Sequence, residues 1–251
     1  DMNDLTLLRQ KSETPPSRSE VKANRARISK FIVKTPILHL YGPVIKNTFG
    51  AGTELFLKLE PFQPTGSFKV RSVLTFLLSL DRDTIQQGLV TMSAGNHAAA
   101  VAYGARCLET NAKVVMPKGT NPRKVALSTQ YGATIVFVDD FLEAQQVIKD
   151  IETTEGRIFV PAWGDPRLSL GTASLGLELI EQTPPLDAFV VAIGGGSICA
   201  GAGTLLKSVW PDCKILAAEP EGAATMLRSF ASGKVEYLEK RETIAEGLAP
   251  P

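Results

Sequence analysis

Short β-rich runs alternate with longer segments of helical period along most of this chain. A strand, a helix and a second strand within roughly 25 residues predict parallel sheets joined by right-handed crossovers, and therefore an α/β fold. The expected strands are residues 54–59, 89–92, 112–116, 133–138, 188–193 and 214–218. The expected helices are residues 68–80, 96–108, 122–131, 141–155, 172–182, 197–209 and 222–231, with an earlier helix capped by Ser19. Such sheets bind ligands beyond the carboxyl ends of their strands, so the loops there are the first candidates for a site.

Basic and acidic side chains nearly cancel, 27 against 26, for a formal net charge of +1. Such a chain has no global field that attracts nucleic acid or an anionic membrane, so a small molecule is the expected partner. Three cysteines without a C-x-x-C pair and two histidines predict neither a disulfide framework nor a zinc centre. No apolar run approaches the ~20 residues of a membrane span and no apolar leader opens the chain, so we expect a cytoplasmic protein.

Composition also suggests how the chain is divided. Residues 1–18 are polar and interrupted by prolines, and we expect them to form a disordered tail. Proline, tryptophan and glycine within residues 161–166 interrupt the alternation and indicate a crossing between two domains, although one long loop is the alternative. The expected division is a larger domain of residues 19–84 and 161–251 and a smaller, mobile domain of residues 85–160.

The first candidate loop leads from the expected strand 54–59 into a helix and reads EPFQPTGSFK. Ser67 can cap that helix, which places Lys69 in its first turn. A cation there opposes the helix dipole by ~0.3–1 kcal/mol, so the amine is either solvated or has its charge suppressed by burial or covalent use. Lys69 is therefore a candidate reactive amine, with an ordinary surface lysine as the alternative.

The second loop, SAGNH at residues 93–97, follows an expected strand and opens an alanine-rich helix. Backbone N–H groups at a helix start, beside a hydroxyl and an amide side chain, suit a carboxylate or a phosphate. In the alternative reading, Ser93 or Asn96 only satisfies the helix end and His97 is a partly buried polar residue.

The third loop, GGGSICAG, follows the expected strand 188–193. Its three consecutive glycines let the backbone approach an anion closely, and the helix start that follows adds a favourable potential. No G-K-[ST] follows, which argues against a Walker loop. A dinucleotide-binding fingerprint fits poorly because Cys199 stands where a third glycine belongs, although Glu219 ends the next strand at a suitable distance. A simple tight turn is the alternative.

Together these loops supply the parts needed to hold a phosphorylated aldehyde and an amino acid. With the motifs KLEPFQPTGSFKVR, SAGNHAAAVA, MPKGTNPRKV and GGGSICAG in this order, the chain resembles the fold type II (tryptophan-synthase-β-like) family of pyridoxal phosphate enzymes. The likeness is greatest to its threonine dehydratase and serine racemase branch. The resemblance implies two open parallel-sheet α/β domains and, by analogy, a homodimer.

The resemblance also implies a role for each loop. Lys69 matches the lysine that forms an imine with pyridoxal phosphate, Phe68 lies beside the cofactor, and Asn96 matches the residue that binds its ring hydroxyl. The loop expected to receive the substrate carboxylate comprises Ser93, Ala94, Gly95, Asn96 and His97. The expected phosphate-binding loop comprises Gly194, Gly195, Gly196, Ser197 and Ile198.

The implied reaction is β-elimination from L-threonine or L-serine, which yields a 2-oxo acid and ammonia. Serine racemases of this branch carry a second proton-transfer serine at the position of Ala94, and an alanine cannot relay a proton, so elimination is favoured over racemisation. β-Replacement, ammonia loss from diaminopropionate and racemisation remain open. Two further hypotheses are a nicotinamide-dependent oxidoreductase that uses residues 194–196 and Glu219, and an inactive relative that serves as a binding module.

The chain departs from the branch at several positions. Ser197 stands where a fourth glycine is usual, and residues 171–174 read GTAS instead of GQGT, which alters the expected substrate-side wall. At the divalent-cation site of some relatives, Thr225 replaces the acid that accompanies Glu219, so no strong metal site is expected. Relatives continue beyond residue 251, so the C-terminal part of the larger domain is expected to be missing from this chain.

Overall fold

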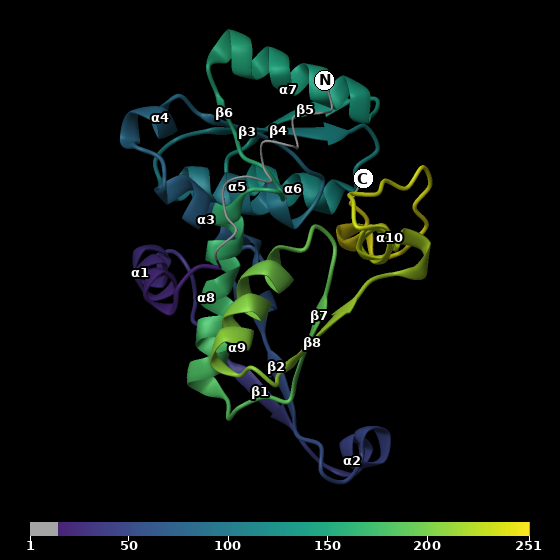
Figure 1. Ribbon diagram of the computed structural model, residues 1–251. Coiled ribbons are helices and arrows are strands. Elements are labelled where there is room, and N and C mark those ends of the chain that lie inside the picture. Colours follow the sequence, from purple (N-terminus) through teal and green to yellow (C-terminus); the bar gives the residue numbers. More distant parts are fainter. Residues whose placement is uncertain (1–14, 251) are drawn as a thin grey trace.

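The computed structural model describes residues 15–250 and has an α/β fold (Figure 1). Its largest sheet has four parallel strands in the order β5-β4-β3-β6. The strands are β3 (Leu89–Met92), β4 (Ala112–Pro117), β5 (Thr134–Val138) and β6 (Ile158–Phe159). The parallel pairing expected for the first three is confirmed, and β6 is an addition that is too short to show a period of its own.

Helices cover both faces of this sheet, with α7 on one face and α5 and α6 on the other (Figure 1). The three are α5 (Asn96–Cys107), α6 (Pro122–Gln130) and α7 (Phe141–Glu155). Neighbouring residues of a strand face opposite cores: Leu89 and Val114 pack with α5, whereas Val90 and Val115 pack with α7. Because both faces are covered, these strands are almost wholly apolar.

The second half of the fold is built around the long helix α8, which packs against α1 and α3 and against the helical segment after β7. Its elements are α1 (Arg18–Ile28), α3 (Lys69–Leu78), α8 (Pro166–Gln182), α9 (Thr204–Val209), β7 (Ala188–Ala192) and β8 (Lys214–Ala218). β7 and β8 pair in parallel, as expected. Figure 1 shows α8 between these strands and α1.

A hairpin departs from the all-parallel prediction. β1 (Ile37–Leu40) and β2 (Leu55–Lys58) pair antiparallel, and α2 (Pro43–Phe49) lies at the tip of this hairpin, at the bottom of Figure 1. The expected strand 54–59 therefore exists but belongs to no parallel sheet. The connection from β1 to β2, residues 41–54, holds only the short helix α2.

Several helix ends differ from the predictions. Ser17, not Ser19, caps α1: its hydroxyl accepts the N–H of Glu20, whose carboxylate accepts the N–H of Ser17 in return. The expected tail of residues 1–18 lies largely outside the described residues, and its described end belongs to this cap. α8 begins six residues early, capped by Asp165. α4 (Arg82–Gln86) was not anticipated.

The expected helix 197–209 begins as a π-helical turn (Cys199–Gly203) and continues as α9. Gly201 lies so close to α8 that a Cβ atom there would come 2.1 Å from the carbonyl oxygen of Ser169 and from Oγ1 of Thr172. The segment after β8 forms short 3₁₀ turns and α10 (Thr225–Ser232) and leads to a final turn, η5 (Glu246–Leu248). This last segment returns toward the four-stranded sheet (Figure 1).

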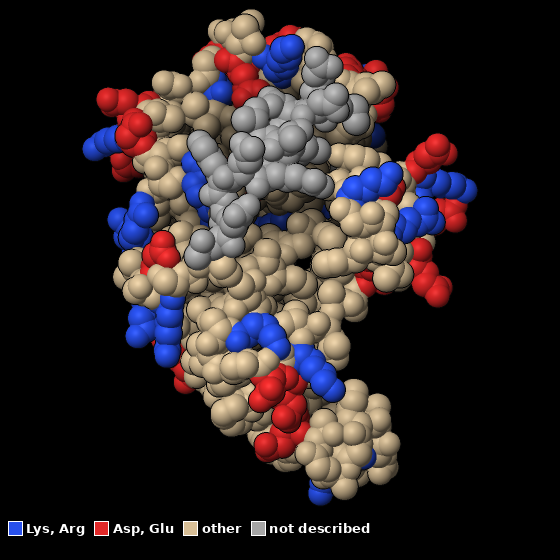
Figure 2. Space-filling view, in the orientation of Figure 1, with Lys and Arg blue, Asp and Glu red and all other residues tan. Residues whose placement is uncertain are grey.

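The surface carries both signs of charge. On the face shown in Figure 2, basic and acidic side chains lie close to one another around the rim. None of the helices within residues 15–250 has the length and apolar composition needed to cross a membrane.

Candidate active site

The three loops singled out in the sequence converge on one cavity of about 750 Å³. They come from the start of α3, the turn between β3 and α5, and the turn after β7. The predicted site residues that line this cavity are Phe68, Lys69, Ser93, Ala94, Gly95, Asn96, His97, Gly194, Gly195, Gly196, Ser197 and Ile198. The structure thus brings all of them together at the carboxyl ends of β3 and β7.

Lys69 is the first residue of α3, and its Nζ donates a hydrogen bond to the carbonyl oxygen of Ala162 at 3.2 Å. Burial lowers the pKa of Lys69 from its usual range to about 8. The predicted cap is wrong: Phe68 occupies the cap position, and Ser67 stands one residue too early for its hydroxyl to reach the helix N–H groups. The amine is therefore neither a solvated surface group nor tied up in an ion pair, and it is easily made neutral.

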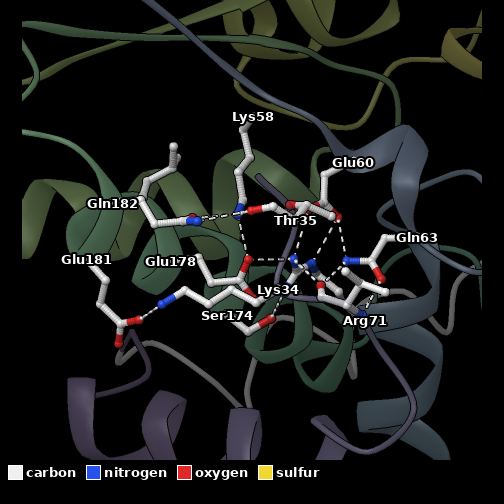
Figure 3. Close-up of polar contacts among 12 residues, drawn as sticks. Lys34, Thr35, Lys58, Glu60, Gln63, Arg71, Ser174, Glu178, Glu181 and Gln182 are labelled. Atoms are coloured by element: carbon white, nitrogen blue, oxygen red, sulfur yellow. Dashed lines mark hydrogen bonds and ion pairs between the residues drawn. The ribbon is translucent and has the colours of Figure 1, made fainter. Parts of the chain in front are cut away.

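A buried cluster of charges holds α3 in place (Figure 3). The guanidinium of Arg71 donates to both carboxylate oxygens of Glu178, at 2.7 and 2.9 Å, and to both of Glu60, at 2.8 and 2.9 Å. Lys58 adds a second cation 2.6 Å from Glu178. Burial opposes the charge of Arg71, but its hydrogen bonds to Glu60 and Glu178 outweigh burial and raise the pKa of Arg71. The contact between Arg71, two residues after Lys69, and Glu178 therefore fixes α3 to α8.

The second loop presents backbone donors. Ser93 Oγ accepts the N–H of Gly95 at 3.1 Å, and α5 begins at Asn96 without a side-chain cap. In the described part of the chain, the N–H groups of Ala94, Asn96 and His97 have no protein acceptor. These residues lie at a helix start and line the cavity, which is an arrangement that suits a carboxylate.

His97 is more deeply buried than either sequence reading expected, with 4% of its surface exposed. One ring nitrogen, Nε2, lies 3.1 Å from the carbonyl oxygen of Val160. Burial and the nearby charge of Lys69 lower the pKa of His97 to about 3. The imidazole is therefore neutral at physiological pH, and it forms part of the floor of the cavity.

The third loop is an anion-binding turn. None of the backbone N–H groups of residues 194–198 meets an acceptor within residues 15–250. Gly196 has φ +80°, and a Cβ atom on Gly195 would lie 2.9 Å from Cβ of Trp163, so both positions need glycine. Thr172 supports the loop from α8 by donating its hydroxyl to the carbonyl oxygen of Ser197 at 2.6 Å. A phosphate fits such a row of donors at a helix start.

One expectation about the cavity wall is wrong. Residues 171–174 are buried within α8 and do not line the cavity. Gly171 lies against the backbone of Arg71, and Thr172 supports the glycine loop from behind. The departure from the usual motif therefore changes how the glycine loop is supported and not the surface that a substrate meets.

The family model for pyridoxal-phosphate dependent enzymes matches residues 28–251. The chain belongs to this family. The residues present fit the cofactor: a buried amine of lowered pKa, a row of N–H donors for its phosphate and a second set of donors for an amino acid carboxylate all line one cavity.

Individual relatives agree with this placement. The phenylserine dehydratase of Ralstonia pickettii is 41% identical over 240 residues, which are 95% of this chain and 72% of that enzyme. The catabolic L-threonine dehydratase of Escherichia coli K12 is 38% identical over 77% of this chain and 59% of its own length. The structure of maize serine racemase matches with a TM-score of 0.87 and 33% identity over 94% of this chain and 71% of that one. The chain thus spans between 59% and 72% of these relatives.

In this pyridoxal phosphate enzyme, Glu219 does not have the role that a nicotinamide site would give it. Its carboxylate accepts the backbone N–H groups of Met226 and Leu227, at 3.1 and 2.7 Å, and so satisfies the start of α10. Among residues 15–250, no cluster of three or more histidine, cysteine or acidic side chains is placed to hold a metal ion.

Sequence reasoning missed several residues of the cavity. Lys124 on α6 and Glu246 in η5 form an ion pair, and both side chains line the cavity. Two large aromatic side chains, Phe141 and Trp163, also line it. The only signal for Trp163 was the break in pattern at residues 161–166, and that for Lys124 was the motif MPKGTNPRKV, which did not indicate a role for the side chain.

Proposed function

We propose that this enzyme catalyses β-elimination from a β-hydroxy α-amino acid such as L-threonine or L-serine, releasing water and then, by hydrolysis, a 2-oxo acid and ammonia. The observation that carries the proposal is the placement of the Lys69 amine, whose pKa is lowered to about 8, in the same cavity as the N–H donors of the second and third loops. The names of two relatives, a phenylserine dehydratase and an L-threonine dehydratase, support the same reaction class.

Each part of the cavity has a defined task in this proposal. The N–H groups of residues 194–198 bind the phosphate of the cofactor, and those of Ala94, Asn96 and His97 bind the carboxylate of the amino acid. When bound, the cofactor supplies an electron sink for the pair left behind when the α-proton is removed. The Lys69 amine would hold the cofactor at its aldehyde and would accept the α-proton of the substrate at Nζ.

The lowered pKa of Lys69 suits this task, because an amine with a pKa near the working pH can be neutral before it takes the proton and charged afterwards. The neutral imidazole of His97 adds no second positive charge beside it. Closure of the proposed smaller domain, residues 85–160, over the carboxylate loop would exclude water from the reaction.

Racemisation is the second candidate because a serine racemase is among the similar structures. Ala94 lines the cavity in the loop expected to bind the carboxylate, and its methyl group can neither give nor take a proton. Lys69 serves one face of the α-carbon, and inversion needs a donor on the other. We therefore favour elimination.

The test starts from the cofactor and ends with products. Purified protein incubated with pyridoxal phosphate should give a visible band that borohydride reduction fixes on the peptide containing Lys69. Keto acid formation from L-threonine and L-serine, and D-serine formation from L-serine, should then be measured together. Keto acid without D-serine supports the proposal, and D-serine formed faster than pyruvate overturns it. Lys69→Ala should abolish both the band and the activity, whereas Lys22→Ala, on the exposed side of α1, should leave both intact.

Two further expectations belong to the same proposal. The near-neutral charge and the mixed surface of Figure 2 fit a protein that acts on small molecules in the cytoplasm. Large exposed apolar side chains on β7, β8 and α10 fit a subunit of a homodimer. They include Val190, Leu216 and Phe230, which are 67%, 49% and 77% exposed.

A further inference from the structure

We propose that this active site takes β-hydroxy amino acids whose β-carbon carries a bulky apolar group, an aryl ring above all, in preference to serine or threonine. The inference rests on the proposed elimination reaction for its chemistry and on the wall of the cavity for its substrate class. Three observations carry it. Two aromatic side chains line the cavity, and one of them lies close to the reacting amine. Charged groups of the cavity wall, among them Asp140 and Lys124, already have partners within the protein.

Phe141 and Trp163 line the cavity but are not packed into the core: they remain 43% and 42% exposed. They come from different parts of the fold, Phe141 from the first turn of α7 and Trp163 from the segment that leads into α8. Large apolar surfaces left open inside a cavity gain free energy when an apolar ligand covers them. A ring can also stack on them with a specific geometry.

Trp163 lies close to the place of reaction. The residue before it, Ala162, accepts the hydrogen bond from Nζ of Lys69 at 3.2 Å. On its other side, Trp163 lies against the glycine loop, where its Cβ is 2.9 Å from the position of a Cβ on Gly195. If Lys69 takes the proton from the α-carbon, the β-carbon is one bond away, so its substituent would occupy the cavity that both Lys69 and Trp163 line.

The rest of this wall offers little to a polar substituent. Met92, Ala94, Ala144 and Leu248 add apolar surface. The carboxylate of Asp140 already caps α7 through the N–H of Glu143 at 2.9 Å, and Lys124 is paired with Glu246. A serine side chain would leave most of the aromatic surface uncovered, whereas a phenyl group would cover it.

Arg241 favours a different substituent. It lines the cavity and donates to the carbonyl oxygen of Ala249 at 3.1 Å, which leaves its charge without a carboxylate partner in the described residues. A second carboxylate on the substrate could pair with it. Trp163 directly follows the residue that accepts the hydrogen bond of Lys69, so we assign the preference to an aryl group and include an acidic substrate in the test.

The test compares kcat/KM of the cofactor-loaded protein for L-threo-3-phenylserine, L-threonine, L-serine and L-threo-3-hydroxyaspartate. We expect phenylserine to exceed L-serine by about 10²-fold, the effect of burying one ring. Trp163→Ala and Phe141→Ala should each lower kcat/KM for phenylserine by about 10-fold and change that for L-threonine much less. Phe49→Ala, which removes an exposed ring on α2 outside the cavity, should change neither.

A second readout separates this inference from the elimination reaction itself. L-Phenylalanine and L-alanine lack the β-hydroxyl that must leave, so their affinities can be measured from the change in cofactor absorbance. L-Phenylalanine should bind at least 10-fold more tightly, and Trp163→Ala should remove that advantage. Tighter binding of L-phenylalanine without keto acid from any substrate would support the substrate class and overturn the elimination. Equal affinities, or a preference for L-serine, L-threonine or hydroxyaspartate over phenylserine, would overturn the inference.

Discussion

Arg71 and Glu178 face each other as a two-pronged ion pair, with Nη1 2.7 Å from Oε1 and Nη2 2.9 Å from Oε2. Both side chains are almost inaccessible, at 0% and 1% exposure. The pair joins α3 to α8, and Glu60 holds the remaining edge of the same guanidinium. The loop from Glu60 to Lys69 is thus closed by a buried contact at each end, which sets the direction of the catalytic amine.

Arg71→Met should therefore lower the free energy of unfolding by about 3–5 kcal/mol, because it leaves two carboxylates buried with one fewer cation between them. Arg71→Lys should recover only part of this loss, since an ammonium cannot form the paired hydrogen bonds of a guanidinium. Urea unfolding of the cofactor-free protein measures both. Arg25→Met is the matched control: its partner Glu181 is partly exposed, so the loss should stay below about 1 kcal/mol. Equal losses at the two arginines would contradict the buried network.

The burial of Lys69 predicts an unusual gain in stability. Its pKa in the folded protein is about 8, below the usual value, so between about pH 8 and 10.5 the unfolded chain binds more protons and stability rises with pH. Lys69→Met should then stabilise the cofactor-free protein by about 3 kcal/mol at pH 7. The gain should vanish near pH 10.5. Lys22→Met on the exposed face of α1 should show no such gain, and its absence at Lys69 as well would mean that the amine is not desolvated.

The glycine loop should tolerate no side chain. Gly196→Ala places a Cβ at φ +80° and 3.3 Å from Cε of Met226, so the loop must shift and its N–H groups no longer converge. We expect the affinity for pyridoxal phosphate to fall at least 10-fold, about 1.4 kcal/mol, in an absorbance titration. Gly52→Ala, where nothing lies within 4 Å, should leave the affinity unchanged. Unaltered binding by the Gly196 variant would exclude this loop as the phosphate site.

Much of the fold could be predicted because most of its parallel strands are apolar runs of four to six residues between segments of helical period. β1 and β6 escaped prediction for a physical reason. β6 has only two residues, and β1 owes its pairing to β2, across an intervening helix, rather than to any pattern of its own. The cap at Ser67 failed by one residue, since a hydroxyl before a helix can serve only from the cap position itself.

The loops of the candidate site could be predicted from the sequence, but the buried residues that hold these loops in place could not. The serine and glycine motifs follow β3 and β7, at the ends where parallel sheets expose their loops, so their convergence could be inferred, whereas the lysine motif follows the antiparallel β2. Arg71 and Glu178 are 107 residues apart in the sequence, and neither lies in a pattern that marks a buried charge. Phe141 and Trp163 likewise share no sequence pattern, and what they have in common is that both line the cavity.

The neutral His97 predicts how the protein loses stability in acid. Its pKa is about 3 when folded and near 6.5 when unfolded, so the unfolded chain binds more protons between those values and stability falls as the pH drops through them. From pH 7 to pH 5 the loss should be about 2 kcal/mol in urea unfolding. His97→Gln should lower stability at pH 7 but flatten this slope. His39→Gln, at an exposed ring, should leave the slope as it is, and an equal slope in all three proteins would refute the assignment.

The ion pair between Lys124 and Glu246 joins α6, beside the four-stranded sheet, to the turn η5 near the C-terminal end, and both residues line the cavity. Lys124 also holds the pKa of Glu246 below its usual range, so this carboxylate is charged at physiological pH. Lys124→Glu should open this side of the cavity by repulsion and raise KM for the amino acid a few-fold, with a smaller effect on kcat. The double variant Lys124→Glu, Glu246→Lys should return KM toward its original value.

Salt at about 1 M should reduce the difference in KM between these proteins. Both side chains are partly exposed, and the screening length is only ~3 Å at that concentration. A single variant whose KM is unchanged at low salt would show that this pair does not control access to the site.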